Sequence, residues 1–293
     1  AGSAEAAATT AMGGRADGAG YGAGANAGAG GASPPRPDAA LSPAAPSLPD
    51  PSLPDRPNAD VVLRGVTFAH PGRAPVIDGL DLVVPAGRRL AITGPSGAGK
   101  STLIRLVAGL ERPSAGEIAI GGAAPVGPGR AANGLRLGLM TQDTELFAGS
   151  IADVLRLGAP EAGDDALHAA CAAAGFSPVL GRLPGALDHR LGERGEGLSG
   201  GERRRLALAR LIVADVDVLL LDEASEGLDG DTAAAVIAGL DAAIGGRTAL
   251  IVTHLAREAR LADILVRLDG SGRIAERAEK GTAAFERMAA RLR

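Results

Sequence analysis

Aromatic residues are scarce in this chain, whose 293 residues include four Phe, one Tyr and no Trp. Sites that depend on aromatic stacking, such as platforms for nucleic-acid bases, are therefore poor candidates. The single cysteine, Cys171, cannot form an intrachain disulfide, and no cysteine and histidine residues have the spacing of a zinc site. This cysteine usage fits a reducing compartment.

Basic stretches and long apolar runs are lacking as well. The formal net charge is -4, whereas nucleic-acid-binding modules usually carry a basic stripe for the phosphates. We therefore expect no nucleic-acid partner. Apolar runs such as residues 218–221 fall far short of the roughly 18 apolar residues that a membrane helix needs.

The composition changes near residue 59. Residues 1–58 contain no Val, Ile or Phe, and nine of the 19 prolines lie between Pro34 and Pro57. Such a segment has too little apolar surface to offset the entropy that is lost on folding. We expect residues 1–58 to be a disordered linker rich in Ala, Gly and Pro, and residues 59–293 to form the folded domain.

From residue 60 onward, short apolar runs alternate with helical stretches. Strands are predicted at 61–68, 80–84, 89–93, 117–120, 135–141, 216–221, 249–253 and 264–268, and a helix at 100–109. Between residues 150 and 214 the strand pattern is lost, and helices are predicted at 151–157, 164–174 and 199–213. This order indicates an α/β fold with a largely parallel sheet and an inserted helical subdomain at about 145–214.

A glycine-rich segment joins the predicted strand 89–93 to the predicted helix 100–109. It comprises Gly94, Pro95, Ser96, Gly97, Ala98, Gly99, Lys100, Ser101 and Thr102. The spacing fits a phosphate-binding loop, in which backbone N–H groups and a helix N-terminus surround the phosphates of a nucleotide. Lys100 would reach the β- and γ-phosphate oxygens, and Ser101 would ligate Mg²⁺. Only one other lysine, Lys280, occurs in the chain, so a lysine at this place argues against a chance glycine turn.

Two adjacent carboxylates, Asp222 and Glu223, follow the predicted strand 216–221. In isolation, two acids after an apolar strand are typical of a turn. Beside a phosphate-binding loop they predict a catalytic pair instead. Asp222 would hold Mg²⁺ through water, and Glu223 would act as the general base or orient the attacking water.

The residues Ser199, Gly200, Gly201 and Glu202 open the predicted helix 199–213. Ser199 is a plausible N-cap and Glu202 stands at the capping-box position, so a plain helix start is one interpretation. The paired glycines weaken a helix start unless bare N–H groups must approach an anion. Contact with a phosphate is therefore the other interpretation.

Together and in this order, the segments 94–101, 198–202 and 222–223 resemble the ABC ATPase family. The resemblance covers about residues 60–290 and implies a P-loop NTPase (RecA-like) core, an antiparallel β subdomain and an inserted helical subdomain. It also implies ATP and Mg²⁺ as cofactors and a second ABC ATPase domain as partner, either identical or different. In this family the phosphate-binding loop of one subunit and the signature of another enclose one ATP, so Ser199 and Gly201 would contact the γ-phosphate bound by the partner.

Smaller motifs extend the resemblance. Gln142 is similar to the family's glutamine that contacts Mg²⁺ and the attacking water, and Asp229 to the aspartate that crosses the dimer interface. His254 is similar to the switch histidine that bonds the γ-phosphate and positions Glu223. Family members usually stack adenine on an aromatic residue, most often tyrosine, after the first strand. His70 stands at that place here, and we therefore expect weaker or less base-selective nucleotide binding.

The segments 146–151 and 192–195 resemble exporter sequences within this family. The resemblance implies the ATP-hydrolysing domain of an exporter at the cytoplasmic face of the inner membrane, with a transmembrane domain fused upstream. The segments 198–210 and 223–229 resemble the heterodimeric exporters of cysteine and glutathione that support cytochrome bd assembly. The ATPase subunit of an importer and a soluble ABC ATPase without a transport role are the alternatives. The arginines at 203–205 are expected to form a helix face near phosphate or acids, without a separate binding role.

Overall fold

The computed structural model describes residues 58–142 and 146–293, which all fall within one compact unit of the chain. The expected linker lies outside the described residues except for Asn58, so its nature and the domain boundaries stay predictions. In the described part of the chain, no helix combines the length and the apolar character that crossing a membrane requires.

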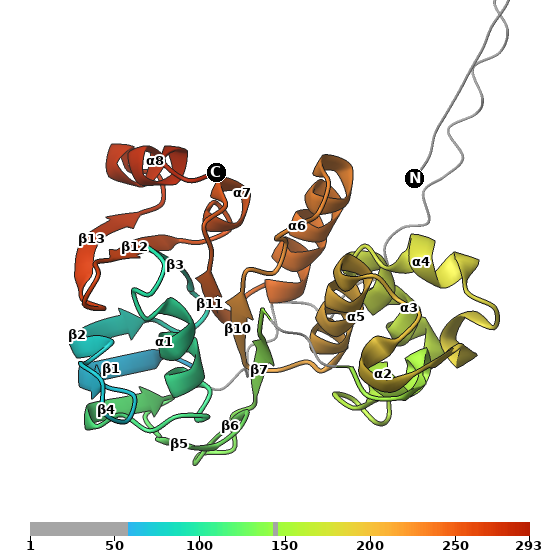
Figure 1. The fold of residues 1–293 in the computed structure, drawn as a ribbon, viewed down its shortest axis with the longest axis horizontal. Coiled ribbons are helices and arrows are strands. Elements are labelled where there is room, and N and C mark those ends of the chain that lie inside the picture. The colour runs from blue at the N-terminus through green and yellow to red at the C-terminus, as the bar shows by residue number, and fades with distance from the viewer. Residues whose placement is uncertain (1–57, 143–145) are drawn as a thin grey trace, which may run out of the picture. The chain divides into compact units, whose positions relative to one another are not determined.

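A six-stranded sheet forms the centre of the described part (Figure 1). Its strands follow the order β13–β12–β3–β11–β10–β7. Their bounds are β3 Arg89–Thr93, β7 Leu137–Met140, β10 Val218–Asp222, β11 Thr248–Val252, β12 Ile264–Leu268 and β13 Ile274–Glu279. All neighbours pair in parallel except β12 and β13. Every residue of β10 and β11 is buried, as expected for parallel strands that are covered on both faces. The predicted α/β fold with a largely parallel sheet is confirmed.

An antiparallel sheet of three strands, in the order β2–β1–β4, forms the expected β subdomain. Its strands are β1 Val61–Phe68, β2 Ile77–Val84 and β4 Ala115–Ile120. Buried residues of this sheet share one apolar cluster with helix α1 (Lys100–Val107) and with the inner strands of the central sheet. The cluster therefore fixes the segment between β3 and α1 against both sheets.

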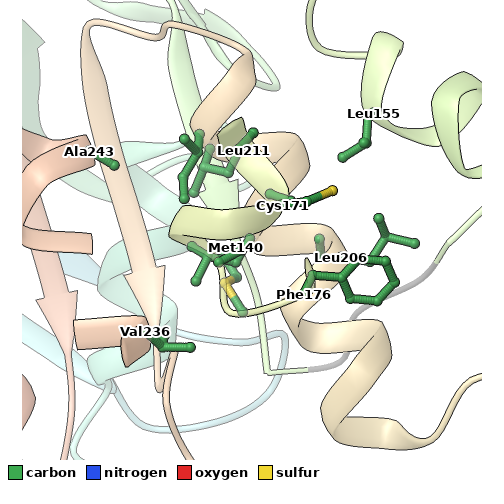
Figure 2. Close-up of a cluster of buried hydrophobic side chains, with 14 of the residues drawn as sticks. Met140, Leu155, Cys171, Phe176, Leu206, Leu211, Val236 and Ala243 are labelled. Atoms are coloured by element: carbon green, nitrogen blue, oxygen red, sulfur yellow. The ribbon is translucent and has the colours of Figure 1, made fainter. Parts of the chain in front are cut away.

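Helices dominate residues 151–213, as predicted. They are α2 Ile151–Arg156, α3 Asp164–Ala173, α4 Ser177–Arg182 and α5 Gly200–Val213. Their apolar residues belong to a cluster that reaches β7 and β10 of the sheet, and Figure 2 shows part of it around Cys171 and Phe176. One short strand pair, β8 Gly149–Ser150 with β9 Arg190–Leu191, lies in this stretch, where strands were not expected. Two-residue strands leave no apolar periodicity in the sequence.

Four further elements follow β10 and lie outside the sequence prediction. They are α6 Gly230–Ile244, α7 Ala256–Ala259, the strand β13 and α8 Ala283–Ala290. A small antiparallel pair, β5 Pro125–Gly127 with β6 Arg130–Ala131, completes the strands. Helix α6 packs against α3 of the helical block, so the two parts of the fold touch through helices as well as through the sheet.

Candidate functional site

Three glycines shape the loop between β3 and α1. Gly94, Gly97 and Gly99 have φ angles of 146°, 80° and 83°, a range that glycine adopts readily and other residues rarely. The space beside two of these glycines is also too small for a side chain. A Cβ at Gly94 would lie 2.7 Å from the carbonyl oxygen of Leu268, and a Cβ at Gly99 would lie 2.9 Å from that of Val76. Conformation therefore favours glycine at all three positions of the predicted phosphate-binding loop, and packing also requires it at Gly94 and Gly99.

Lys100, the first residue of α1, folds back over this loop. Its Nζ donates to the carbonyl oxygens of Gly94 at 3.0 Å and Pro95 at 2.8 Å. Burial lowers the pKa of Lys100, and the charges of Glu223 and Asp222 oppose this shift. The ammonium group thus lies between the glycine loop and the acids at the end of β10.

The next residue, Ser101, bonds the buried acid of that pair. Its side chain forms a hydrogen bond with Asp222, which is only 6% exposed. Burial raises the pKa of Asp222, while the bond from Ser101 and the charge of Lys100 oppose this shift. Hydroxyl and carboxylate oxygens are the ligands that Mg²⁺ takes from proteins when it also binds substrate phosphates. The donor chemistry of Ser101 and Asp222 therefore fits Mg²⁺.

Glu223 leaves the strand in an unusual conformation. Its φ is 55°, in the left-handed region that residues with a side chain seldom adopt. Its backbone N–H donates to the carbonyl oxygen of Val252 on β11 at 2.9 Å, which fixes this turn. Strained backbone of this kind gathers at functional sites. As a result the two neighbouring acids have different surroundings, and the Glu223 side chain faces the loops that follow β7 and β11.

The three residues predicted to be catalytic meet there. His254 Nδ1 lies 3.0 Å from Oε1 of Glu223, and Gln142 Nε2 donates to Oε2 of Glu223 at 3.1 Å. Burial, together with the neighbouring Glu226, raises the pKa of Glu223, and His254 opposes this shift. The three residues follow β7, β10 and β11 in the chain. They come together because parallel strands end at the same edge of a sheet, where ligands of such folds bind.

Two members of this cluster were missed by the sequence analysis. Oε1 of Glu226 lies 3.7 Å from His254 Nε2, and Oε2 lies 3.5 Å from Gln142 Nε2. Hydrogen bonding with Glu223 lowers the pKa of Glu226. Arg204 of α5 donates to the carbonyl oxygens of Glu226 at 2.6 Å and Gln142 at 3.3 Å. Arg204 thus joins two loops beside an acid, a structural contact that is compatible with the expected helix face near acids and was not specified from the sequence.

The N-terminus of α5 lies at the predicted signature. Ser199 N–H donates to the Glu202 carboxylate at 2.8 Å, and Glu202 N–H donates to Ser199 Oγ at 3.4 Å, so the capping box is present. Burial would raise the pKa of Glu202, but the bonds from Ser199 and the contact with Arg182 outweigh it and lower the pKa. Ser199 and Gly200 are exposed. Helix α5, which carries the predicted signature, packs on α2, α3 and β7. Helix α1, which follows the glycine loop, packs on β10 and β11.

His70 and Asp229, two further predicted nucleotide contacts, lie at the surface. His70 follows β1 and is exposed. Its ring packs edge-on against Phe68, with the ring centres 5.1 Å apart at an interplanar angle of 86°. Asp229 caps α6 by accepting from Thr232 N–H at 3.0 Å. These contacts explain how both side chains are held, and their roles toward a nucleotide stay predictions.

Comparisons with known proteins agree on one family. Residues 77–226 match the family model described as ABC transporter. The "Mycobactin import ATP-binding/permease protein IrtB" of Mycolicibacterium smegmatis is 41% identical over 211 residues, which cover 72% of this chain and 36% of that protein. The "Beta-(1-->2)glucan export ATP-binding/permease protein NdvA" of Brucella suis is 38% identical over 228 residues, which cover 76% and 38%.

A solved structure leads to the same family. It is described as "Structure of a bacterial Atm1-family ABC exporter with ATP bound" and superposes with a TM-score of 0.70 at 32% identity. The match covers 80% of this chain and 42% of that one. The chain therefore spans well under half the length of these relatives.

Proposed function

Because this chain belongs to the ABC transporter family, we propose that it is the ATP-binding and ATP-hydrolysing domain of an exporter. The observation that carries the proposal is the cluster of Glu223, His254 and Gln142 at one edge of the central sheet. Lys100 and the bonded pair of Ser101 and Asp222 belong to the same edge.

The side chains divide the work of hydrolysis. The loop N–H groups and Lys100 bind the β- and γ-phosphates, as in other phosphate-binding loops. Ser101 and Gln142 would hold Mg²⁺ directly and Asp222 would hold it through water. The ion would supply positive charge against the charge that develops on the phosphates. Glu223 accepts a proton from the attacking water or orients it, and His254 holds the Glu223 carboxylate in place.

A second copy of an ABC ATPase domain completes each site in this proposal. The exposed Ser199, with Gly200 and Gly201, presents backbone N–H groups at the start of α5, where an anion is favoured. Asp229 lies at the surface where it could reach a partner. Both relatives described above carry the words ATP-binding and permease in one protein name. We therefore place a transmembrane domain upstream in the same polypeptide and this domain at the cytoplasmic face of the inner membrane.

No particular transported substrate is assigned to the proposed exporter. The segments 198–210 and 223–229 support a heterodimeric exporter of cysteine and glutathione only by resemblance. Uptake is a second candidate, because the relative from Mycolicibacterium smegmatis is named as a mycobactin importer. A soluble ATPase without a transport role has no support among the relatives named here.

Substitution of Glu223 tests the catalytic assignment. Glu223→Gln should slow ATP hydrolysis by about 10²-fold to 10⁴-fold, the range for loss of a general base, while ATP binding is retained and the ATP-bound dimer accumulates. Phosphate release, calorimetric ATP titration and size-exclusion chromatography measure these three outcomes. Glu161→Gln, at an exposed glutamate before α3, is the matched control. Hydrolysis at the wild-type rate in Glu223→Gln would remove the catalytic assignment.

A further inference from the structure

Glu226 has no task in the hydrolysis proposed above, although it lies within the cluster. Its Oε1 lies 3.7 Å from His254 Nε2 and its Oε2 lies 3.5 Å from Gln142 Nε2. His254 and Gln142 contact Glu223 at the same time. The resemblance to the family assigns His254 to the γ-phosphate, and Gln142 to Mg²⁺ and the attacking water. Glu226 thus offers a carboxylate to two side chains whose proposed partners surround the terminal phosphate of ATP.

Arg204 fixes the backbone of Glu226 in this place. One guanidinium donates to the Glu226 carbonyl oxygen at 2.6 Å and to the Gln142 carbonyl oxygen at 3.3 Å. A planar group with several donors can hold two acceptors in a defined arrangement. The separation of the two loops is therefore set by helix α5, which carries Arg204.

We propose that Glu226 is a positioning residue that takes the place of the terminal phosphate in the nucleotide-free chain. It holds His254 and Gln142, and ATP must displace it from both side chains when it binds. The inference rests on the proposed ATPase function, because it concerns the same site. The Glu226 carboxylate lies close to both side chains, and two anions at one place repel each other. ADP lacks the terminal phosphate and does not compete with Glu226.

Nucleotide binding by Glu226→Ser tests this inference. We expect the Kd for ATP to fall by about twofold to fivefold, the effect of one partly exposed charged contact, and the Kd for ADP to stay unchanged. Isothermal titration calorimetry in EDTA measures both affinities without hydrolysis. Glu161→Ser makes the same change of charge at an exposed site and should leave both values unchanged. An unchanged ATP affinity, or equal gains for ATP and ADP, overturns the inference.

Two further variants keep the test informative if Glu226→Ser destabilises the fold. Glu226→Gln keeps the size of the side chain and should show the same selective gain for ATP, even if Glu226→Ser melts at a lower temperature. Arg204→Gln releases the loop that carries Glu226 and should give a smaller gain in the same direction. The wild-type chain separates the two proposals. If it fails to bind ATP, the proposed function is wrong; if it binds ATP and the variants show no selective gain, only the inference about Glu226 is wrong.

Discussion

Two acids that are neighbours in the sequence, Asp222 and Glu223, have different environments in the structure. Asp222 is buried and bonds Ser101, whereas the side chain of Glu223 reaches His254. The positive φ of Glu223 turns the chain where strand β10 ends. Successive side chains of a strand point to opposite faces, and this turn adds to that divergence. A single backbone torsion thus contributes to the proposed separation of the metal-holding acid from the acid that acts on water.

The residue at the expected adenine position gives a prediction about affinity. His70→Tyr should tighten ATP binding by about threefold to tenfold, because a phenol ring offers more stacking surface than an imidazole and aromatic pairs contribute about 0.5–1.5 kcal/mol. Calorimetric titration with ATP measures this gain. His168→Tyr, at an exposed histidine of α3, is the control and should have no effect. If His70→Tyr binds ATP no more tightly than the wild type, His70 does not stack on adenine.

Helices and strands that have a strong local sequence pattern could be predicted, whereas those with a weak pattern could not. Strands β1, β3 and β12 have the predicted bounds because their apolar runs end at clear turns. Strand β13 was missed because three of its six residues are charged and only one is buried. Helix α6 could have been predicted, since its buried residues recur at helical spacing after the cap Asp229.

The candidate site likewise contains residues that local motifs predict and residues that only the fold brings together. The predicted phosphate-binding loop and acid pair are local motifs, so their spacing alone is enough to predict them. Glu226 and Arg204 carry no such motif. Gln142 and Glu226 are 84 positions apart, and Arg204 is 62 positions from Gln142. Their contact depends on two loops and one helix meeting in the folded chain, which no local pattern in the sequence indicates.

The contact between α3 and α6 gives a prediction about stability. A Cβ at Gly239 of α6 would lie 1.7 Å from the carbonyl oxygen of Ala173 in α3. Gly239→Ala should therefore force the helices apart and lower the free energy of unfolding by about 1–3 kcal/mol, although alanine is the better helix former. Urea denaturation measures the change.

Gly181→Ala in α4 is the matched control for this contact. No atom lies within 4 Å of a Cβ at Gly181, so the substitution should be neutral or slightly stabilising. If Gly239→Ala and Gly181→Ala change the free energy of unfolding equally, Gly239 is not needed for the close packing of α3 on α6.

At the scale of the whole molecule, the helical block and the central sheet share one apolar cluster. Arg204 adds a polar link, because it joins α5 to the loops after β7 and β10. A movement of the helical block would therefore reach Gln142 and Glu226 directly. This arrangement suits a domain in which the state of the nucleotide site must be passed to a partner.

The proposed sharing of ATP between two chains predicts complementation. Lys100→Ala removes the ammonium group that we propose binds phosphate. Gly201→Asp adds a carboxylate at the start of α5, where the nearest atom to a Cβ is Leu228 Cδ2 at 3.7 Å. The second variant should therefore keep its fold, and each variant alone should be inactive. In an equal mixture of the two, about half of the dimers are mixed and have one intact site of two, so about a quarter of wild-type phosphate release should return. If mixed dimers form and no activity returns at any ratio, Lys100 and Gly201 do not act on one ATP from opposite chains, since each mixed dimer would hold one undamaged pair of these residues.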